Sequence, residues 1–366
     1  MSIERKYKLK IQNFADATMN FEDIFNQRTL IDYSANFTYK PFLGDQLFPN
    51  IKTADLKVAF NELDTLMPVV ASVHGFDTKA EIGSREGFAQ LEMEKILIKR
   101  QLPIREELLI NLTNPRTNSE FQQLIGQLFD DVRKLTMGVL ARCEAMKMEM
   151  LATGKITIDE NEVNVTLDYE VPATHKETLS DTDLWSDYEN SDPISDIMTW
   201  TQTIIDDTGI TPRYALTSSK VASILRQHPK VQLAINGANY AGKLVTLSDV
   251  NALLSSLELP TIATYDEQYR KETHNKAKPY EQKRYFPVDT FVIFPEENLG
   301  NGVFGDTPES RLLTRKGFDV SSMGNVTITR YSTEDPANEW TKATGLFVPT
   351  FPAYKNVFQA KVIEVD

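Results

Sequence analysis

The most regular hydrophobic pattern in the chain lies between residues 118 and 152, where apolar side chains recur at intervals of three or four. This spacing places one continuous apolar stripe on a helix. The stripe consists of Phe121, Ile125, Leu128, Val132, Leu135, Val139, Cys143, Met146 and Met150. A helix from Asn118 to Ala152 would be about 50 Å long. We therefore predict a coiled coil or a spine across a flattened domain, and the strand pattern that follows favours the spine.

Both ends of this predicted helix carry boundary signals. Thr117 and Glu120 have the spacing of a capping box, and Gly154 suits the left-handed residue that ends a helix. Gly126 and Gly138 interrupt the stripe, at a cost of about 1 kcal/mol each in a helix interior. We expect another element to pack closely against the helix at these two glycines.

Polar and apolar residues alternate after Gly154, as they do in half-buried strands. The segments ITI and VNVTLDY, within residues 156–169, predict two strands joined by an acidic turn at 159–162. The polar stretch that follows, up to Asp192, is interpreted as a linker or loop with a solvated surface.

Two segments precede the helix. Residues 67–110 carry strand-like flanks around Gly83-Ser84-Arg85-Glu86-Gly87, which predicts a long β-hairpin that projects from the body. A solvated hairpin is one interpretation, and packing against a neighbouring copy is the other, because an isolated two-stranded ribbon is marginal in water. Residues 1–66 predict an extended arm with little core. Within the arm, Tyr7, Leu9 and Ile11 alternate with lysines, as in a strand or a solvated basic terminus.

Helices and strands alternate from Asp192 onward, which predicts a compact α/β domain. Asp192 and Pro193 form a helix start, and Gly209 a helix end. The remaining segments FVIFP, VTITRYSTEDP and VFQAKVIEV indicate a buried strand, an edge strand and a last strand. We expect them to complete the sheet begun at residues 156–169, so that the α/β domain is inserted into a discontinuous α+β body.

Charge and composition limit the classes of function that are possible for this chain. The formal net charge of -13 argues against general affinity for nucleic acid, although it does not exclude enclosing it. The chain lacks a run of about 18 apolar residues, and its start, MSIERKYKLK, lacks a signal-peptide core, which predicts a cytoplasmic product without a membrane span. The single cysteine, Cys143, lies on the apolar stripe and predicts an inert core thiol.

One catalogue motif is present, Gly300-Asn301-Gly302-Val303-Phe304-Gly305, which matches the glycine pattern of dinucleotide-binding turns. Its surroundings lack the strand-turn-helix arrangement of that fold, so we expect a glycine-rich loop without a cofactor. The four histidines are scattered, and no nucleophile, base and oxyanion site come together. The sequence therefore predicts no enzyme, no cofactor and no metal.

The order of these parts resembles the major capsid proteins of tailed bacteriophages, specifically the lambda-type capsid protein E family with the Hong Kong 97 capsid fold. Four segments carry the resemblance, and together they reach from about residue 30 to the end. They are RCEAMKMEMLATGKITI, DPISDIMTWTQTIIDDTGITPRYALTSSKVASILRQHP, RYFPVDTFVIFPEENLGNGVFGDTPE and EDPANEWTKATGLFVPTFPAYKNVFQAKV.

The resemblance implies an arm at 1–66, an extended β-hairpin loop at 67–110, a peripheral domain with the spine helix at 111–191, an axial domain at 192–284, and return strands at 285–366 that complete the peripheral domain. It implies self-assembly into pentamers and hexamers of an icosahedral head that encloses double-stranded DNA. The implied partners are further copies and the scaffolding, portal and decoration proteins. The implied location is the virion, after assembly in the host cytoplasm.

Four charged residues are the candidate subunit contacts. Arg85 and Glu86 lie at the predicted hairpin tip, and Lys99 and Arg100 lie on its second flank. We predict that they form ion pairs between subunits. A bacterial nanocompartment shell that encloses enzyme cargo is the alternative with the same fold, and a nucleotide-binding enzyme based on the Gly300 motif is the alternative of another class.

Overall fold

The computed structural model describes residues 39–61, 90–104, 118–239, 243–273, 277–295, 298–312, 320–335 and 337–365. The chain divides into two compact units, each assembled from separate stretches of sequence. The first comprises Met1–Lys40, Leu97–Leu140 and Gly305–Leu346. The second comprises Pro41–Ile96, Ala141–Phe304 and Phe347–Asp366.

The predicted spine helix is confirmed as α5 (Asn118–Thr153), a helix of 36 residues. It contributes residues 118–140 to the first unit and the rest to the second. The stripe is buried at every position whose side chain is described: Leu128, Val132, Leu135, Val139, Cys143, Met146 and Met150. Burial raises the pKa of the Cys143 thiol, in keeping with an inert core cysteine. Thr117, the predicted cap, lies outside the described residues.

The glycines of α5 behave differently from one another. Gly138 lies against the side chain of Arg100, and a Cβ added at Gly138 would lie only 3.0 Å from the guanidinium, so the close packing expected there is confirmed. Gly126 has no described atom within 4 Å of such a Cβ, so close packing at this position stays a prediction. Gly154 has the predicted left-handed conformation, with φ of 73°.

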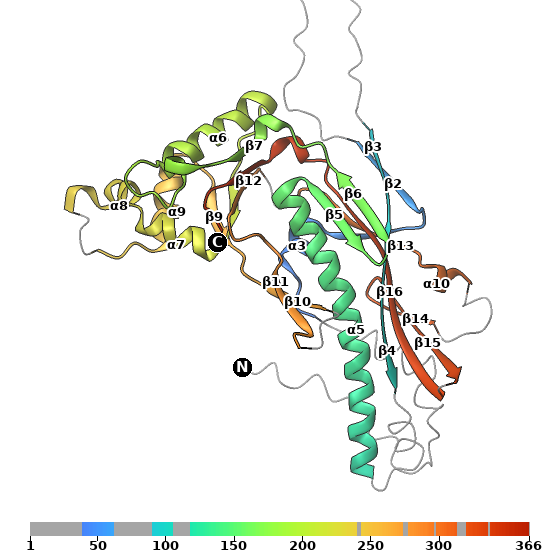
Figure 1. The fold of residues 1–366 in the computed structure, drawn as a ribbon. Coiled ribbons are helices and arrows are strands. Elements are labelled where there is room, and N and C mark those ends of the chain that lie inside the picture. Colours follow the sequence, from blue (N-terminus) through green and yellow to red (C-terminus); the bar gives the residue numbers. More distant parts are fainter. Residues whose placement is uncertain are drawn as a thin grey trace, which may run out of the picture. The chain divides into compact units, whose positions relative to one another are not determined.

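The second unit contains a five-stranded sheet in the order β7-β17-β12-β8-β9. Its strands are β7 (Lys176–Thr178), β8 (Tyr214–Thr217), β9 (Thr261–Thr264), β12 (Thr290–Phe294) and β17 (Phe358–Lys361). Central β12 runs antiparallel to both neighbours, whereas the outer pairs β17–β7 and β8–β9 are parallel. Helices α6 (Pro193–Thr208), α7 (Ser219–Gln227), α8 (Pro229–Asn236) and α9 (Leu247–Ser256) gather around this sheet (Figure 1).

Aromatic packing holds this sheet and its helices together. The Trp185 ring stacks on Trp200 at 5.7 Å between centroids and meets Phe291 edge-on at 5.1 Å. Trp200 also stacks on Phe358 at 5.3 Å. The predicted start and end of α6 are confirmed, because Asp192 accepts a hydrogen bond from the Ser195 amide and Gly209 is left-handed.

One expectation about this region is wrong. The strands β12 and β17 pair within the five-stranded sheet, and β5 (Lys155–Glu160) and β6 (Val163–Asp168) pair only with each other among the described strands. The stretch between residues 170 and 191 is largely irregular and exposed, as expected of a loop, but it also supplies β7 and the fully buried Trp185. It also forms two short 3-10 turns, η2 (Ala173–His175) and η3 (Asp181–Asp183).

The later residues of the expected arm are part of the folded body. Helix α3 (Leu43–Leu47) is followed by β1 (Asn50–Thr53), which pairs with β13 (Asn301–Gly305). Leu47 and Phe48 are buried, which corrects the expectation of an arm with little core. The described residues begin at 39, so the strand-like basic segment at the N-terminus lies outside them.

The predicted hairpin is described only at its base. Strand β2 (Lys57–Asn61) pairs antiparallel with β3 (Gln90–Glu94), and Asn61 lies opposite Gln90. The second flank is confirmed as strands β3 and β4 (Ile96–Ile104), but the partner of β3 starts ten residues earlier than the predicted first flank and belongs to the predicted arm. The turn at 83–87 lies outside the described residues.

The first unit contains the antiparallel strands β14 (Val320–Met323), β15 (Val326–Glu334) and residues 337–346 of β16 (Ala337–Thr350). Strand β4 also pairs with β16, and the short helix α10 (Pro308–Leu312) follows β13. Strand β15 has β14 on one side and β16 on the other, so the prediction of an edge strand there is wrong.

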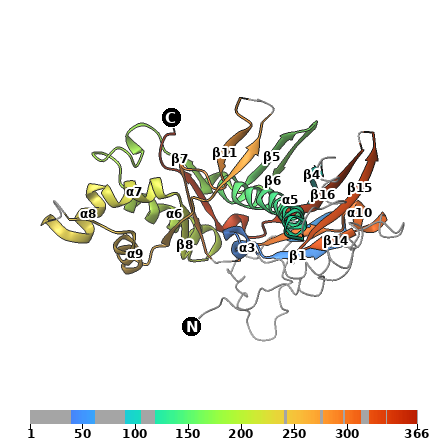
Figure 2. The same ribbon diagram turned by 90° about the horizontal axis from the view of Figure 1, so that it is seen from below.

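The remaining described elements are a ribbon and two turns in the second unit. They are β10 (Gln268–Glu272), β11 (Tyr280–Arg284), η4 (Gly237–Asn239) and η6 (Tyr354–Asn356). The ribbons β5–β6 and β10–β11 both stand beside α5 (Figure 2). No helix in the described part of the chain combines the length and hydropathy of a membrane span.

The turn at Gly154, between α5 and β5, provides a test of the fold. We expect Gly154→Ala to destabilise the protein by about 2–4 kcal/mol, because a Cβ meets both backbone strain and crowding. That Cβ would lie 2.7 Å from Cγ2 of Val171. Gly324→Ala is the matched control, since Gly324 also has positive φ but no described atom within 4 Å of the added Cβ. The control should lose about 1 kcal/mol in urea unfolding. Equal losses in the two variants would contradict the crowding at Gly154.

Candidate functional site

The structure describes two of the four predicted contact residues. Arg85 and Glu86 lie outside the described residues. Lys99 and Arg100 lie on β4, and both have contacts within the first unit. The ammonium of Lys99 lies 3.8 Å from Oε1 of Glu309, and the Arg100 side chain packs on Gly138. Their role between subunits therefore stays a prediction.

Lys99 is the more distant of two lysines around Glu309. Nζ of Lys342 lies 2.8 Å from Oε1 of Glu309, and the Thr344 hydroxyl lies 3.4 Å away. Burial alone would raise the pKa of Glu309, but the hydrogen bonds to the carboxylate and the positive charges of Lys342 and Lys99 together outweigh it, and the pKa is lowered. Glu309 is thus held as a buried carboxylate by Lys342, while the Lys99 side chain remains half exposed.

The glycine motif at 300–305 is neither a nucleotide turn nor a loop, which corrects both interpretations. It forms β13, which pairs antiparallel with β16 from Asn301 opposite Thr350 onward. A Cβ on Gly300 would lie 2.1 Å from the carbonyl oxygen of Thr350, and one on Gly302 would lie 2.5 Å from Oδ1 of Asn50. These two glycines allow neighbouring chain segments to approach closely.

A serine and a histidine are in contact in the second unit, and their hydrogen bonds argue against catalysis. Nε2 of buried His228 lies 3.0 Å from Oγ of Ser191, which itself donates to the carbonyl of Asp187. Nδ1 of His228 accepts from the Lys230 amide. The ring proton is therefore on Nε2 and donates to Ser191, the reverse of the arrangement needed in a general base. Among the described side chains, no group of three or more His, Cys, Asp and Glu could hold a metal ion.

A buried polar cluster joins α5 to the segment of α3 and β1. Lys147 is almost fully buried, and its Nζ lies 2.8 Å from Oδ1 of Asp45 and 2.8 Å from Oδ1 of Asn50. Nδ2 of Asn50 donates in turn to Oδ1 of Asp45 at 2.8 Å. Burying an ammonium is costly unless it is paired and hydrogen-bonded, so this cluster fixes the α3–β1 segment on the helix.

Glu144, one turn before Lys147, extends the cluster to a third segment. Its Oε1 accepts from the Gly44 amide at 3.0 Å and from the Tyr265 hydroxyl at 2.9 Å. Its Oε2 is buried and has no hydrogen-bond partner among the described residues. Burial raises the pKa of Glu144 to about 7, despite the two donors.

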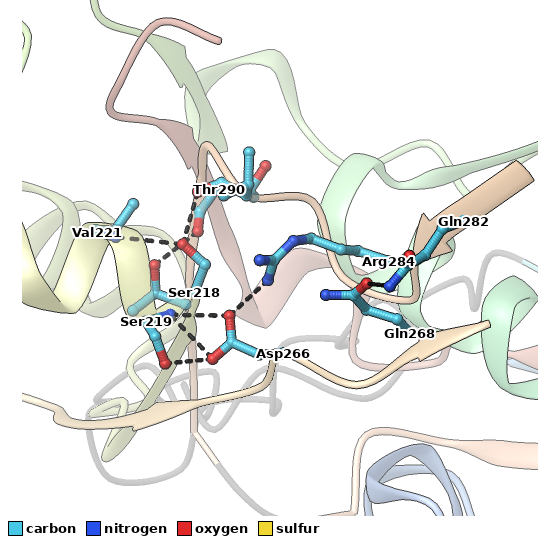
Figure 3. Close-up of polar contacts among 10 residues, drawn as sticks. Ser218, Ser219, Val221, Asp266, Gln268, Gln282, Arg284 and Thr290 are labelled. Carbon is cyan, nitrogen blue, oxygen red and sulfur yellow. Dashed lines mark hydrogen bonds and ion pairs between the residues drawn. The ribbon is translucent and has the colours of Figure 1, made fainter.

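Asp266, next to Tyr265, is the centre of a second cluster (Figure 3). Its carboxylate accepts from the Ser219 amide, at 3.2 Å from each oxygen, and from the Ser219 hydroxyl. Nη1 of Arg284 lies 2.6 Å from Oδ1 of Asp266. Burial alone would raise the pKa of Asp266, but the bonds from Ser219 and Arg284 prevail and lower it.

The Asp266 cluster ties a ribbon to a helix. Asp266 precedes β10 and Arg284 ends β11, so both feet of the β10–β11 ribbon are held at the N-terminus of α7. Ser218 caps that helix by accepting from the Val221 amide and donates to the carbonyl of Val288. Asp266 therefore lies between two strands, because β9 ends at Thr264 and β10 begins at Gln268.

Two solved structures share the fold of this chain. A capsid protein described for a prophage of E. coli CFT073 is 16% identical, with a TM-score of 0.58, and the match covers 92% of this chain and 99% of that chain. A phage-related protein from Bordetella bronchiseptica RB50 is 13% identical, with a TM-score of 0.52 over 91% of this chain and 96% of that one. At such identities the similarity shows the fold alone, and the fold is the predicted α+β capsid fold of the Hong Kong 97 type.

Residues 27–360 match the family model described as phage major capsid protein E. The match spans most of the chain, so the protein belongs to this family and is a tailed-phage capsid protein, as predicted. Its role is structural. None of the curated proteins with which the sequence was compared matches it.

Glu144 generates a prediction about pH. Its folded pKa of about 7 exceeds the value of about 4.3 in an unfolded chain, so the protonated form favours folding. This contribution is fully present below about pH 4.3 and is lost as the pH rises through 7. In the parent, we expect Glu144 to lower the free energy of unfolding by up to about 3 kcal/mol between about pH 5 and about pH 8.5. In Glu144→Gln, this decrease should be absent.

Glu94→Gln is the control for this measurement, because Glu94 is exposed on β3. The control should keep the pH dependence of the parent. A Glu144→Gln variant with the parent's pH dependence would show that Glu144 does not titrate between these pH values in the folded protein.

The Asp266 cluster generates a second prediction. We expect Asp266→Ala to cost about 1–2 kcal/mol, because it leaves the first turn of α7 and Arg284 without their shared acceptor. Hydrogen exchange should become faster in the amides of α7 and of the β10–β11 ribbon. Asp159→Ala, at an exposed position of β5, serves as the control and should change neither region. Unchanged exchange in α7 would rule out a capping role for Asp266.

Proposed function

We propose that this protein is the major head protein of its phage, forming pentamers and hexamers of an icosahedral shell that encloses double-stranded DNA. The observation that carries the proposal is the match to the phage major capsid protein E family over residues 27–360. The double-stranded DNA, the two capsomer types and the site of assembly in the host cytoplasm belong to the proposal.

The proposed mechanism is repeated contact between copies of the chain. The arm at 1–66 and the extended loop at 67–110 reach neighbouring subunits, the peripheral domain at 111–191 is completed by segments of 285–366, and the axial domain at 192–284 surrounds the capsomer axes. Each contact is weak in itself, but a closed symmetric shell repeats it in every subunit.

Arg85, Glu86, Lys99 and Arg100 are proposed to form ion pairs with neighbouring subunits. The half-exposed Lys99 supports this role best among the described members, because Glu309 is already paired with Lys342 at a shorter distance. An additional carboxylate from a neighbour would find the Lys99 ammonium accessible.

The charge of the chain suits a container. A net charge of -13 disfavours tight binding of the wall to packaged DNA, because like charges repel. Scaffolding, portal and decoration proteins are the partner classes that we propose beyond the chain itself. No observation favours a nanocompartment, and the glycine motif behind the enzyme alternative is an antiparallel strand.

Electron microscopy of the purified protein, alone and coexpressed with the other head genes of its phage, tests the proposal. We expect closed shells whose nucleic acid, once packaged, resists nuclease. Shells filled with a co-purified enzyme would favour the nanocompartment. Monomers that never assemble under any of these conditions would refute the shell.

The proposed ion pairs have their own test in the same assay. We expect Arg85→Ala/Glu86→Ala to raise the protein concentration needed for assembly by about fivefold, as expected for about 1 kcal/mol per exposed pair. Lys57→Ala/Glu92→Ala is the matched control, since this exposed pair lies 3.3 Å apart within one chain. If both double variants assemble like the parent, Arg85 and Glu86 do not form the proposed contact.

A further inference from the structure

The β5–β6 ribbon has one apolar face that runs across both strands. Ile156 lies opposite Leu167 and Ile158 lies opposite Val165, so these side chains point to the same face. Ile156 and Ile158 are buried. Val163 and Val165 on β6 are 45% and 38% exposed, so the apolar face continues from a covered strand onto an uncovered one.

The two edges of the ribbon differ. On the β5 side, the Thr157 amide donates to Oε1 of Glu149 on α5 at 3.0 Å, and the Glu160 carboxylate is held by Lys271 of β10 at 2.6 Å and by Arg142 of α5 at 3.3 Å. On the other side, β6 pairs with no described strand except β5. Among the described residues, its outer row of backbone donors and acceptors therefore has no strand partner.

Strand β6 lacks the devices that usually protect an open edge. Edge strands are commonly blocked by proline, a bulge or an inward-pointing charge. The sequence VNVTLD has no proline, pairs in unbroken register with β5, and carries its one charge on Asp168, which is engaged by Lys155 at 2.7 Å. A two-stranded ribbon is also marginal by itself, so a third strand would complete it.

We propose that the segment Lys6–Ile11 of a second copy of this chain adds to the open edge of β6 as the third strand. This inference rests on the proposed function, because the shell brings second copies into contact. The segment alternates Tyr7, Leu9 and Ile11 with lysines, so its apolar side chains extend the face of Val163 and Val165. It has six residues, as β6 has.

Charge supports the same occupant. The ribbon presents exposed carboxylates at its turn and foot, on Asp159, Glu162 and Glu170. The lysines of the added strand would lie on the polar face, beside Asn164 and Thr166, within reach of the carboxylates at one end. Opposite charges next to a shared edge select the register and the partner.

Engineered cysteines test the pairing directly, because the chain's single cysteine, Cys143, is buried. A chain with Val165→Cys is assembled together with a chain carrying Tyr7→Cys, Leu9→Cys or Ile11→Cys, and the product is oxidised gently. We expect a cross-linked heterodimer on a non-reducing gel for at least one position, since residues facing each other on adjacent strands meet disulfide geometry. Lys8→Cys, on the opposite face, is the matched control and should cross-link at least about tenfold less.

The outcomes separate this inference from the proposed function. Shells that form without a cross-link above the Lys8→Cys level overturn the pairing and leave the shell intact. A heterodimer formed without shells supports the pairing while the proposed shell fails, and chains that neither assemble nor cross-link overturn both. In a further outcome, a chain that carries both cysteines cross-links within itself while the mixed chains do not cross-link. That result would show that the chain's own segment pairs with β6, and it would overturn the proposal of a second copy.

A charge placed on the edge provides a second measurement. We expect Val165→Lys to raise the concentration needed for shell assembly about tenfold, with the thermal unfolding of the unassembled chain unchanged because Val165 is already exposed. Val365→Lys, at another exposed valine, is the control and should assemble like the parent. Equal assembly of both variants would overturn the pairing.

Discussion

The second unit depends on an ammonium group that is buried beside the spine helix. Lys147 can be accommodated there only because Asp45 and Asn50 approach it from the chain before and within β1. Removing one partner of a buried ion pair typically costs about 3–5 kcal/mol, since the remaining charge is left without compensation. The position of the α3–β1 segment on α5 is therefore determined by electrostatics as well as by apolar packing.

The same constraint explains two glycines far apart in the sequence. A Cβ on Gly44 would lie 2.3 Å from Oε2 of Glu144, and one on Gly302 would lie 2.8 Å from Cε of Lys147. Both positions must lack a side chain for the charged groups of α5 to reach their partners. Strand β13, which contains Gly302, is thereby fixed between β1 and β16. A motif that resembles a nucleotide-binding turn is required here by close packing.

The sequence predicted local features well, because their causes are local. The apolar stripe of α5, the Asp192 cap and the left-handed Gly209 and Gly154 each depend on residues within a few positions. Strand pairing could not be predicted in the same way, since nothing in FVIFP distinguishes β8 and β17 from β5 as partners. Glu144 and Lys147 were missed because their partners lie about a hundred residues away, and the apolar residues around them gave no sign of a buried charge.

The candidate site shows the same limit in another form. Arg85, Glu86, Lys99 and Arg100 were chosen for their charge and their place on a predicted hairpin, which identifies exposed residues but not their partners. Within the first unit, Lys99 contacts α10 and Arg100 contacts α5. The spacing of residues in a hairpin does not predict these contacts. Asp266 was overlooked because a β-like run continues through it. Its bond to the start of α7 joins residues 47 apart in the sequence, which local patterns do not predict.

A shell protein needs surfaces that are incomplete in the single chain but already have the right shape. The β5–β6 ribbon fits this requirement, because Glu160 is tied to Lys271 and Arg142 before any partner arrives. At the other end of β5, the strand follows Gly154, whose amide donates to the Met150 carbonyl of α5 at 2.8 Å. Binding at a surface that is already ordered avoids much of the entropy cost of association. The uncovered valines of β6 can therefore contribute to contact between copies even though each contact buries only a small apolar area.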